Sequence, residues 1–160
     1  MGALFRFSLS ALFLLVGSAV GSAGEPSAIP KHFIARIGGF LGSSYSVELK
    51  DGAITYTSSS RGKTNARHAI TPTEAQWREF RRTLDELKVW TWRDDYPRGG
   101  VVDGTQWMLD IAYDNHLLKT RGDNNYPDVD GKPTGKPEFT AAFDCFLAAV
   151  KRLIGGKEFG

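Results

Sequence analysis

The sequence contains a single cysteine among its 160 residues, and this scarcity narrows what the protein can be. One cysteine excludes an internal disulfide framework and any zinc site built from several thiolates. The chain also lacks an excess of charge of one sign. Its formal net charge is +2, and a charge this small does not indicate a nucleic-acid partner. With 41% hydrophobic residues, the chain is typical of one domain that needs neither disulfide nor metal for stability.

Long apolar runs are missing except at the N-terminus. There, the run from Phe7 to Val20 follows Arg6 and precedes the small residues Gly21, Ser22 and Ala23. This order is typical of a secretory signal peptide, and the run is shorter than the roughly 20 apolar residues of a membrane span. We predict a signal peptide over 1–23, cleaved after Ala23 or alternatively after Gly21, with an uncleaved anchor as the other interpretation.

Cleavage would make the protein secreted or periplasmic, with no membrane contact afterwards. The remaining 137 residues carry one net positive charge, because only Arg6 is lost. They divide into a linker with two prolines over 24–31, a single domain over 32–156 and a short tail over 157–160.

Alternating apolar and polar residues predict two hairpins. Asp51-Gly52 is a strong two-residue turn signal between 45–50 and 53–58, and Asp114-Asn115 separates a second pair of strands. The polar segment 58–66 is expected to be flexible, and 122–137 is expected to be a loop. The strands are expected over 32–37, 45–50, 53–58, 105–113 and 117–121.

Apolar stripes at spacings of three and four predict two helices. The first follows Thr71, which we expect to cap it, with Pro72 at its first position and Glu74 completing a capping box. The second is expected over 138–154 and ends at Gly155-Gly156.

These elements predict an α+β fold, in the order β-β-β-α-β-β-α. The antiparallel sheet would have four or five strands, with both helices on one face. The two halves of the domain resemble each other. A ββα pseudo-repeat is one interpretation of this similarity, and chance is the other.

No catalytic constellation is recognisable. The three histidines, His32, His68 and His116, lack the spacing of metal ligands, and no serine lies in a nucleophile-elbow pattern. We therefore expect a protein that is not an enzyme and has no cofactor. A small hydrolase remains an alternative, and it would need two titratable groups that converge in a cleft.

Cys145 falls away from the apolar stripe of the second helix, beside Ala141, Ala148 and Arg152. We expect either an inert thiol buried in a packing contact or an accessible thiol. In an oxidising compartment an accessible thiol can form a disulfide-linked dimer.

The segment 123–131 is rich in oxygen donors. Its candidate calcium ligands are Asp123, Asn125, Asp128 and Asp130, although alignment with the EF-hand loop fails at its first and twelfth positions. A turn-rich loop without any ion accounts for the same composition.

Aromatic residues gather in the middle of the chain, and core packing is the default interpretation for them. Where exposed, they would stack on sugars or anchor a partner. An envelope carbohydrate-binding module using Trp90, Trp92 and Tyr126 is therefore an alternative function, which burial of these rings would exclude. The binding candidates in this region are Trp90, Trp92, Tyr96, Asn124 and Tyr126.

Two stretches resemble known families. Asp103-Gly104-Thr105-Gln106-Trp107-Met108-Leu109-Asp110-Ile111, followed by Gly122-x-Asn124-x-Tyr126-Pro127, resembles a pattern of uncharacterised bacterial secreted domains. Arg36-Ile37-Gly38-Gly39-Phe40-Leu41-Gly42, together with the order of elements, is similar to the emfourin family. Emfourins are small protein inhibitors of thermolysin-like metalloproteases, so this resemblance implies a protease partner.

The first functional hypothesis is therefore a non-enzymatic protein-binding domain, with a metalloprotease inhibitor as its sharpest form. Its partner would be a secreted protease or another protein, and an envelope glycan is the alternative. The candidate contact is the loop Gly38, Gly39, Phe40 and Leu41, in which an apolar tip between glycines would enter a partner's pocket; a simple bulge or turn is the plainer interpretation.

Overall fold

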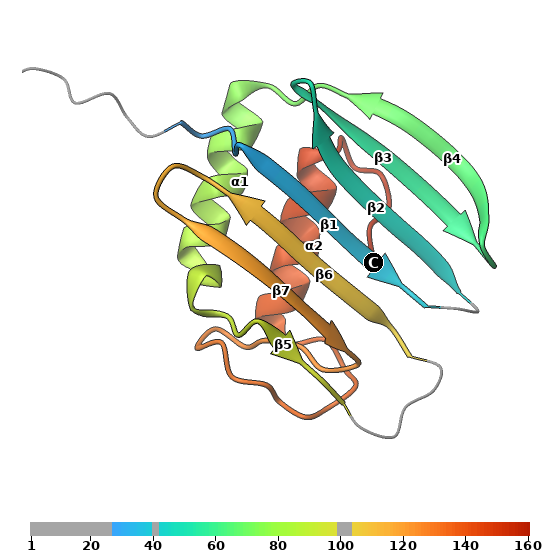
Figure 1. Cartoon of the computed structure of the whole chain (residues 1–160), viewed down its shortest axis with the longest axis vertical. Helices are drawn as coiled ribbons and strands as arrows, with labels where there is room; N and C mark the ends of the chain where they lie inside the picture. Colours follow the sequence, from blue (N-terminus) through green and yellow to red (C-terminus); the bar gives the residue numbers. More distant parts are fainter. Residues whose placement is uncertain (1–26, 40–41, 99–103) are drawn as a thin grey trace, which may run out of the picture.

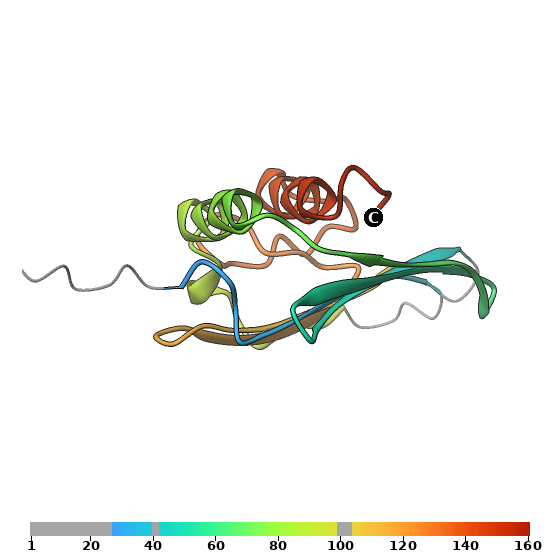
Figure 2. The same cartoon turned by 90° about the horizontal axis from the view of Figure 1, so that it is seen from above.

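The computed structural model describes residues 27–39, 42–98 and 104–160. It shows an α+β fold in which two helices lie on one face of a seven-stranded, mostly antiparallel sheet (Figures 1 and 2). The predicted signal peptide, Phe40, Leu41 and Asp103 lie outside the described residues. The described chain contains no helix with the length and apolar character that a membrane span requires.

Seven strands form the sheet in the order β4-β3-β2-β1-β6-β7-β5, and only β5 runs parallel to its neighbour. The helices are α1 (Glu74–Glu86), the short 3-10 helix η1 (Val89–Thr91) and α2 (Ala141–Leu153). The strands are β1 (His32–Gly38), β2 (Ser43–Lys50), β3 (Ala53–Ser60), β4 (Lys63–Ile70), β5 (Asp95–Tyr96), β6 (Gln106–Ala112) and β7 (Leu117–Asp123).

The sheet contains two strands, β4 and β5, that the sequence did not predict. The segment 58–66, expected to be flexible, instead extends β3, turns at Arg61-Gly62 and enters β4. Both turn residues have positive φ, 48° and 74°, as in the turn at Asp51-Gly52. The other unexpected strand, β5, has two residues and pairs with Arg121 and Gly122.

The helix α1 begins two residues later than its predicted cap implies. Thr73, not Thr71, is the N-cap: its side chain accepts a hydrogen bond from the Gln76 backbone N–H at 3.2 Å. The Gln76 side chain in turn accepts from the Thr73 backbone N–H at 2.8 Å, so Gln76 rather than Glu74 completes the capping box.

The C-terminal end also differs from the prediction. Thr140 caps α2, which starts at Ala141, so Phe139 lies before the helix and is exposed. The residues 157–160 are not a free tail, because Phe159 is only 3% exposed and the Tyr56 hydroxyl donates to the Glu158 carbonyl at 3.0 Å.

The core is an aromatic layer between the sheet and the helices. Trp107 on β6 lies at its centre, with ring centroids 4.9 Å from Phe143 on α2 and 5.6 Å from Tyr96 on β5. Phe33 on β1 packs on Trp77 and Phe80 of α1. Burial of each such side chain contributes roughly 1.5–3 kcal/mol, which fixes which face of the sheet the helices cover.

We expect Thr73→Ala to lower the free energy of unfolding by about 1 kcal/mol, because it removes the N-cap acceptor. Thr71→Ala is the matched control and should stay within about 0.5 kcal/mol of the wild type. Urea unfolding followed by circular dichroism measures both. Equal losses, or a larger loss for Thr71→Ala, would contradict the observed cap.

Candidate protein-binding surface

The outer face of the sheet, opposite the helices, is uncovered and polar (Figure 2). Along each strand the residues between the buried ones point to this side. Near the end where β1 finishes, the face forms an open hollow of about 1020 Å³. Its outward-facing side chains are those of Arg36, Ser44, Ser46, Thr57, Ser59, Asp95, Gln106, Met108, Arg121 and Asp123.

Arg36 lies near the middle of this hollow. It is paired in register with Ser46 of β2 on one side and Met108 of β6 on the other. Within the described residues, no carboxylate is within ion-pairing distance of its guanidinium, whereas Arg121 is paired with Asp95 at 3.2 Å. The guanidinium of Arg36 is exposed between Ser46 and Met108, while the carboxylates of the hollow, Asp95 and Asp123, belong to β5 and β7. An unpaired, exposed guanidinium of this kind is suited to bind a carboxylate.

The sequence patterns did not single out Arg36 as a binding residue. The signal was nevertheless present: in the strand 32–37, Phe33, Ala35 and Ile37 occupy the buried face, and Arg36 therefore had to point outward.

Gly38 and Gly39 lead out of β1 at the edge of the hollow, where the predicted contact loop begins. A Cβ on Gly38 would lie 2.5 Å from the Ser44 Cα, and one on Gly39 would lie 2.9 Å from the Gly104 carbonyl oxygen. The two connections that contain 40–41 and 99–103 therefore leave the sheet at the same end. The glycines serve close backbone packing, and residues 40–41 themselves lie outside the described part.

Asn124, a predicted binding residue, and its neighbour Asn125 hold the residues on either side of the β5–β6 connection. Asn124 accepts through Oδ1 from the Thr105 N–H at 2.8 Å and donates its own N–H to the Thr105 carbonyl at 3.0 Å. Buried Asn125 donates to the Pro97 carbonyl and accepts from the Gly135 N–H, both at 3.2 Å. Both amides are therefore engaged within the protein.

Three of the predicted aromatic binding residues belong to the core. Trp92, Tyr96 and Tyr126 are 4%, 0% and 1% exposed. The Tyr96 hydroxyl donates to the Gly131 carbonyl at 2.7 Å, and burial raises its pKa. The expectation that these rings face a ligand is therefore wrong, and stacking of a sugar on Trp92 or Tyr126 is excluded by the criterion of burial.

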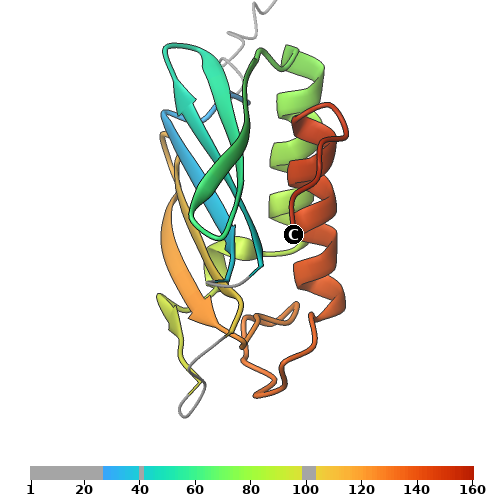
Figure 3. The ribbon, with the colours of Figure 1, turned by 90° about the vertical axis from the view of Figure 1, so that its right-hand side faces the viewer.

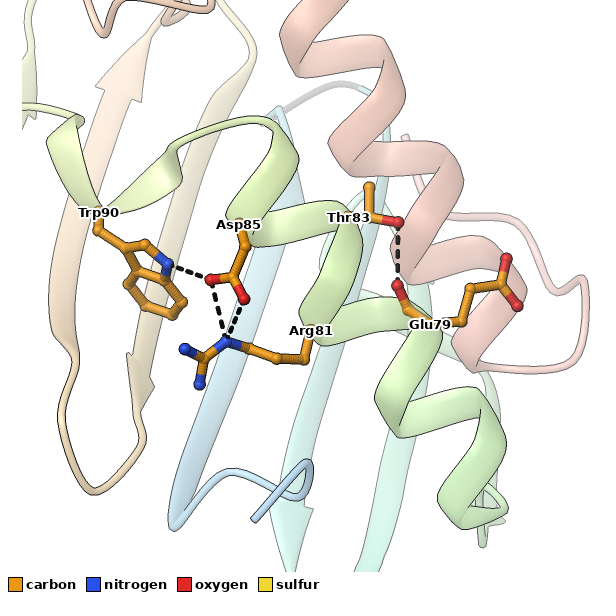
Figure 4. A network of polar contacts seen from close by, with 5 residues as sticks. All are labelled: Glu79, Arg81, Thr83, Asp85 and Trp90. Atoms are coloured by element: carbon orange, nitrogen blue, oxygen red, sulfur yellow. Dashed lines mark hydrogen bonds and ion pairs between the residues drawn. The ribbon is translucent and has the colours of Figure 1, made fainter. Parts of the chain in front are cut away.

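Trp90 differs, because it lies in the 3-10 helix η1 (Val89–Thr91) and is only half-buried. Its indole N–H donates to Asp85 at 2.6 Å, and Asp85 also holds Arg81 at 2.9 Å (Figure 4). The Arg81 guanidinium carbon lies 4.4 Å from the Tyr113 ring centroid and 5.2 Å from that of Trp90. The half-buried Trp90 thus joins α1 to the β6–β7 hairpin.

The histidines lie on three separate elements. His32 is on β1, with Nε2 3.4 Å from Asp110; His68 is on β4, stacked on Tyr56; and His116 follows the turn of the β6–β7 hairpin. None of them lines the hollow. His68 instead lines a smaller hollow of about 340 Å³ together with Tyr45, Tyr56, Lys157 and Glu158, so the small-hydrolase alternative stays an untested prediction.

The predicted calcium ligands likewise do not gather. Asp128 accepts from the Val129 N–H at 2.8 Å, and Asp130 is paired with Lys132 at 2.8 Å. The hydrogen bond from Lys132 lowers the pKa of Asp130. Within residues 27–39, 42–98 and 104–160, no three His, Cys, Asp or Glu side chains are grouped as metal ligands would be.

A scan of protein-family models and a search of curated proteins found no match to this chain.

We expect Gly38→Ala to lower the free energy of unfolding by about 2 kcal/mol or more, because its methyl group would collide with the Ser44 backbone. Gly42→Ala is the matched control: an added Cβ there meets nothing within 4 Å, and stability should change by less than about 0.5 kcal/mol. Urea unfolding compares the two. If both variants retain wild-type stability, the close contact at Gly38 is refuted.

Cys145 is exposed on α2, as one of the two sequence-based interpretations required. We expect a maleimide to label it in the folded protein, and air oxidation to yield a dimer on a non-reducing gel. Cys145→Ser and added reductant should each abolish the dimer. Labelling only after unfolding in urea would contradict the accessibility, and labelling without dimer formation would contradict the disulfide-linked dimer.

Proposed function

We propose that this chain is a secreted or periplasmic protein-binding domain without catalytic activity, and that a protein partner docks on the outer face of the sheet. The observation that carries the proposal is the contrast between the two faces. Helices cover the inner face, whereas the outer face keeps an open polar hollow of about 1020 Å³ around the exposed Arg36.

The chemistry of the hollow favours a protein over a glycan. Sugar sites use exposed aromatic rings, and the rings of Trp92, Tyr96 and Tyr126 are buried in the core. The hollow combines Arg36 with serine, threonine and glutamine side chains and with the charged groups of Asp95, Arg121 and Asp123. Such a mixture of charges and hydrogen-bonding groups suits a peptide segment that carries a carboxylate and free backbone groups.

A partner seated on this face would have its own surface covered. Gly39 and Gly104 approach each other closely at the rim of the hollow, so the backbone of both would lie beside a partner that is seated on Arg36. Together with the similarity in layout to emfourins and the predicted signal peptide, this supports a secreted metalloprotease as the partner and inhibition as the consequence.

The proposal is tested by titrating residues 24–160 against a thermolysin-like protease while peptide hydrolysis is followed. We expect inhibition by micromolar protein, and at least tenfold weaker inhibition by Arg36→Glu, which is about 1.4 kcal/mol of binding free energy. Arg78→Glu reverses a charge on the solvent face of α1 and should inhibit as the wild type does.

The absence of inhibition at micromolar excess would refute the inhibitor role. Inhibition that Arg36→Glu leaves unchanged would instead refute the outer face as the contact surface. Loss of inhibition in Arg78→Glu as well would assign the effect of Arg36→Glu to overall charge.

A further inference from the structure

The two edges of the sheet are protected very differently. At one edge, β5 has two residues and is followed directly by Pro97, which has no N–H to offer. At the other edge, β4 has eight residues and no proline. Six of these eight residues are exposed, and both helices lie away from β4 (Figure 3).

The turns on either side of β3 determine which backbone groups of β4 are free. Both are two-residue turns with positive φ at both positions, and the residues that flank such a turn form a hydrogen-bonded pair. The flanking pairs are Lys50 with Ala53 and Ser60 with Lys63, so the even-numbered residues of β3 bond to β4.

The pairing of β3 with β4 is interrupted by a β-bulge, because Ser59 pairs with Thr64 whereas Ser58 pairs with Ala66. Beyond the bulge the register is regular, and the even-numbered residues of β3 engage Ala66, His68 and Ile70. The intervening residues, Arg67 and Ala69, therefore direct their backbone N–H and C=O groups away from the sheet. These groups have the spacing that an additional antiparallel or parallel strand requires.

The same hairpin is markedly basic. Between Asp51 and Glu74 the chain contains Arg61, Lys63 and Arg67 but no aspartate or glutamate. In a chain whose net charge is only +2, this is a local excess of one sign. A second copy of this chain would bring like charges together at β4, whereas an acidic strand would be attracted.

We infer that β4 is a docking edge for an extended, acidic protein segment, which adds to the sheet as an eighth strand. Backbone hydrogen bonds to Arg67 and Ala69 supply the pairing, and Arg61, Lys63 and Arg67 select acidic side chains. This edge adjoins the hollow around Arg36, because Arg67 is paired with Thr57 of its lining, but the inference rests on the backbone of β4 and does not depend on protease inhibition.

The probe is a capped eight-residue peptide of alternating glutamate and threonine, titrated into residues 24–160 and followed by NMR. We expect saturable shifts in β4 and β3 and slower exchange of the Arg67 and Ala69 amide protons. Ala69→Pro, which removes one free N–H, should weaken binding at least tenfold, whereas Ala69→Ser, which keeps that N–H, should bind as the wild type does.

Further variants and a modified peptide distinguish the contribution of charge to binding from that of backbone hydrogen bonds. Arg67→Glu should weaken binding several-fold, and Arg78→Glu on α1 should leave it unchanged. A peptide N-methylated at alternate residues should not bind the wild-type protein, a result that stands even if Ala69→Pro fails to fold. Three results would overturn the inference: no binding of the peptide, equal binding of the N-methylated peptide, or binding of phosphatidylglycerol vesicles but not of the peptide.

Discussion

One-sided burial of the sheet is the constraint on which the rest of this structure depends. The helices α1 and α2 bury the inward-facing residues of β1 and, on β6, Trp107, Leu109 and Ile111. Side chains alternate between the two faces of a sheet along each strand. When every second residue is buried under the helices, the residues between them therefore point to the outer face. The uncovered outer face, with Arg36 at its centre, follows from how the core is packed.

The aromatic residues illustrate how the same constraint changes the functional interpretation. Trp92, Tyr96 and Tyr126 would be binding groups on a surface, but here they fill the space between β6 and α2. Because these rings are buried, our two proposals place partners on the polar outer face and at the free edge of β4 instead. Both offer hydrogen bonding and charge, which favours protein segments over sugars.

Local chemistry was readable in the sequence where it acts within a few residues. The turn at Asp51-Gly52 and the alternation over 105–113 predicted elements that the structure contains. The turn at Arg61-Gly62 has the same backbone conformation but was missed, because β4 is an edge strand with two exposed faces and so lacks hydrophobic alternation. The N-cap of α1 was predicted at the wrong threonine because Thr71 and Thr73 carry the same hydroxyl group. The structure distinguishes them, since only the Thr73 side chain accepts the hydrogen bond from the Gln76 backbone N–H.

The sequence by itself determined the α+β class, the two amphipathic helices and the hairpins at Asp51-Gly52 and Asp114-Asn115. These follow from periodicity and turn chemistry, which are local properties. The tertiary structure decided the order of the strands, the pairing of β5 and the docking of Phe159, because these depend on contacts between residues far apart in the chain. It also decided that Asn124 and the aromatic residues serve the interior, since residue type alone does not distinguish a buried polar or aromatic group from a binding one.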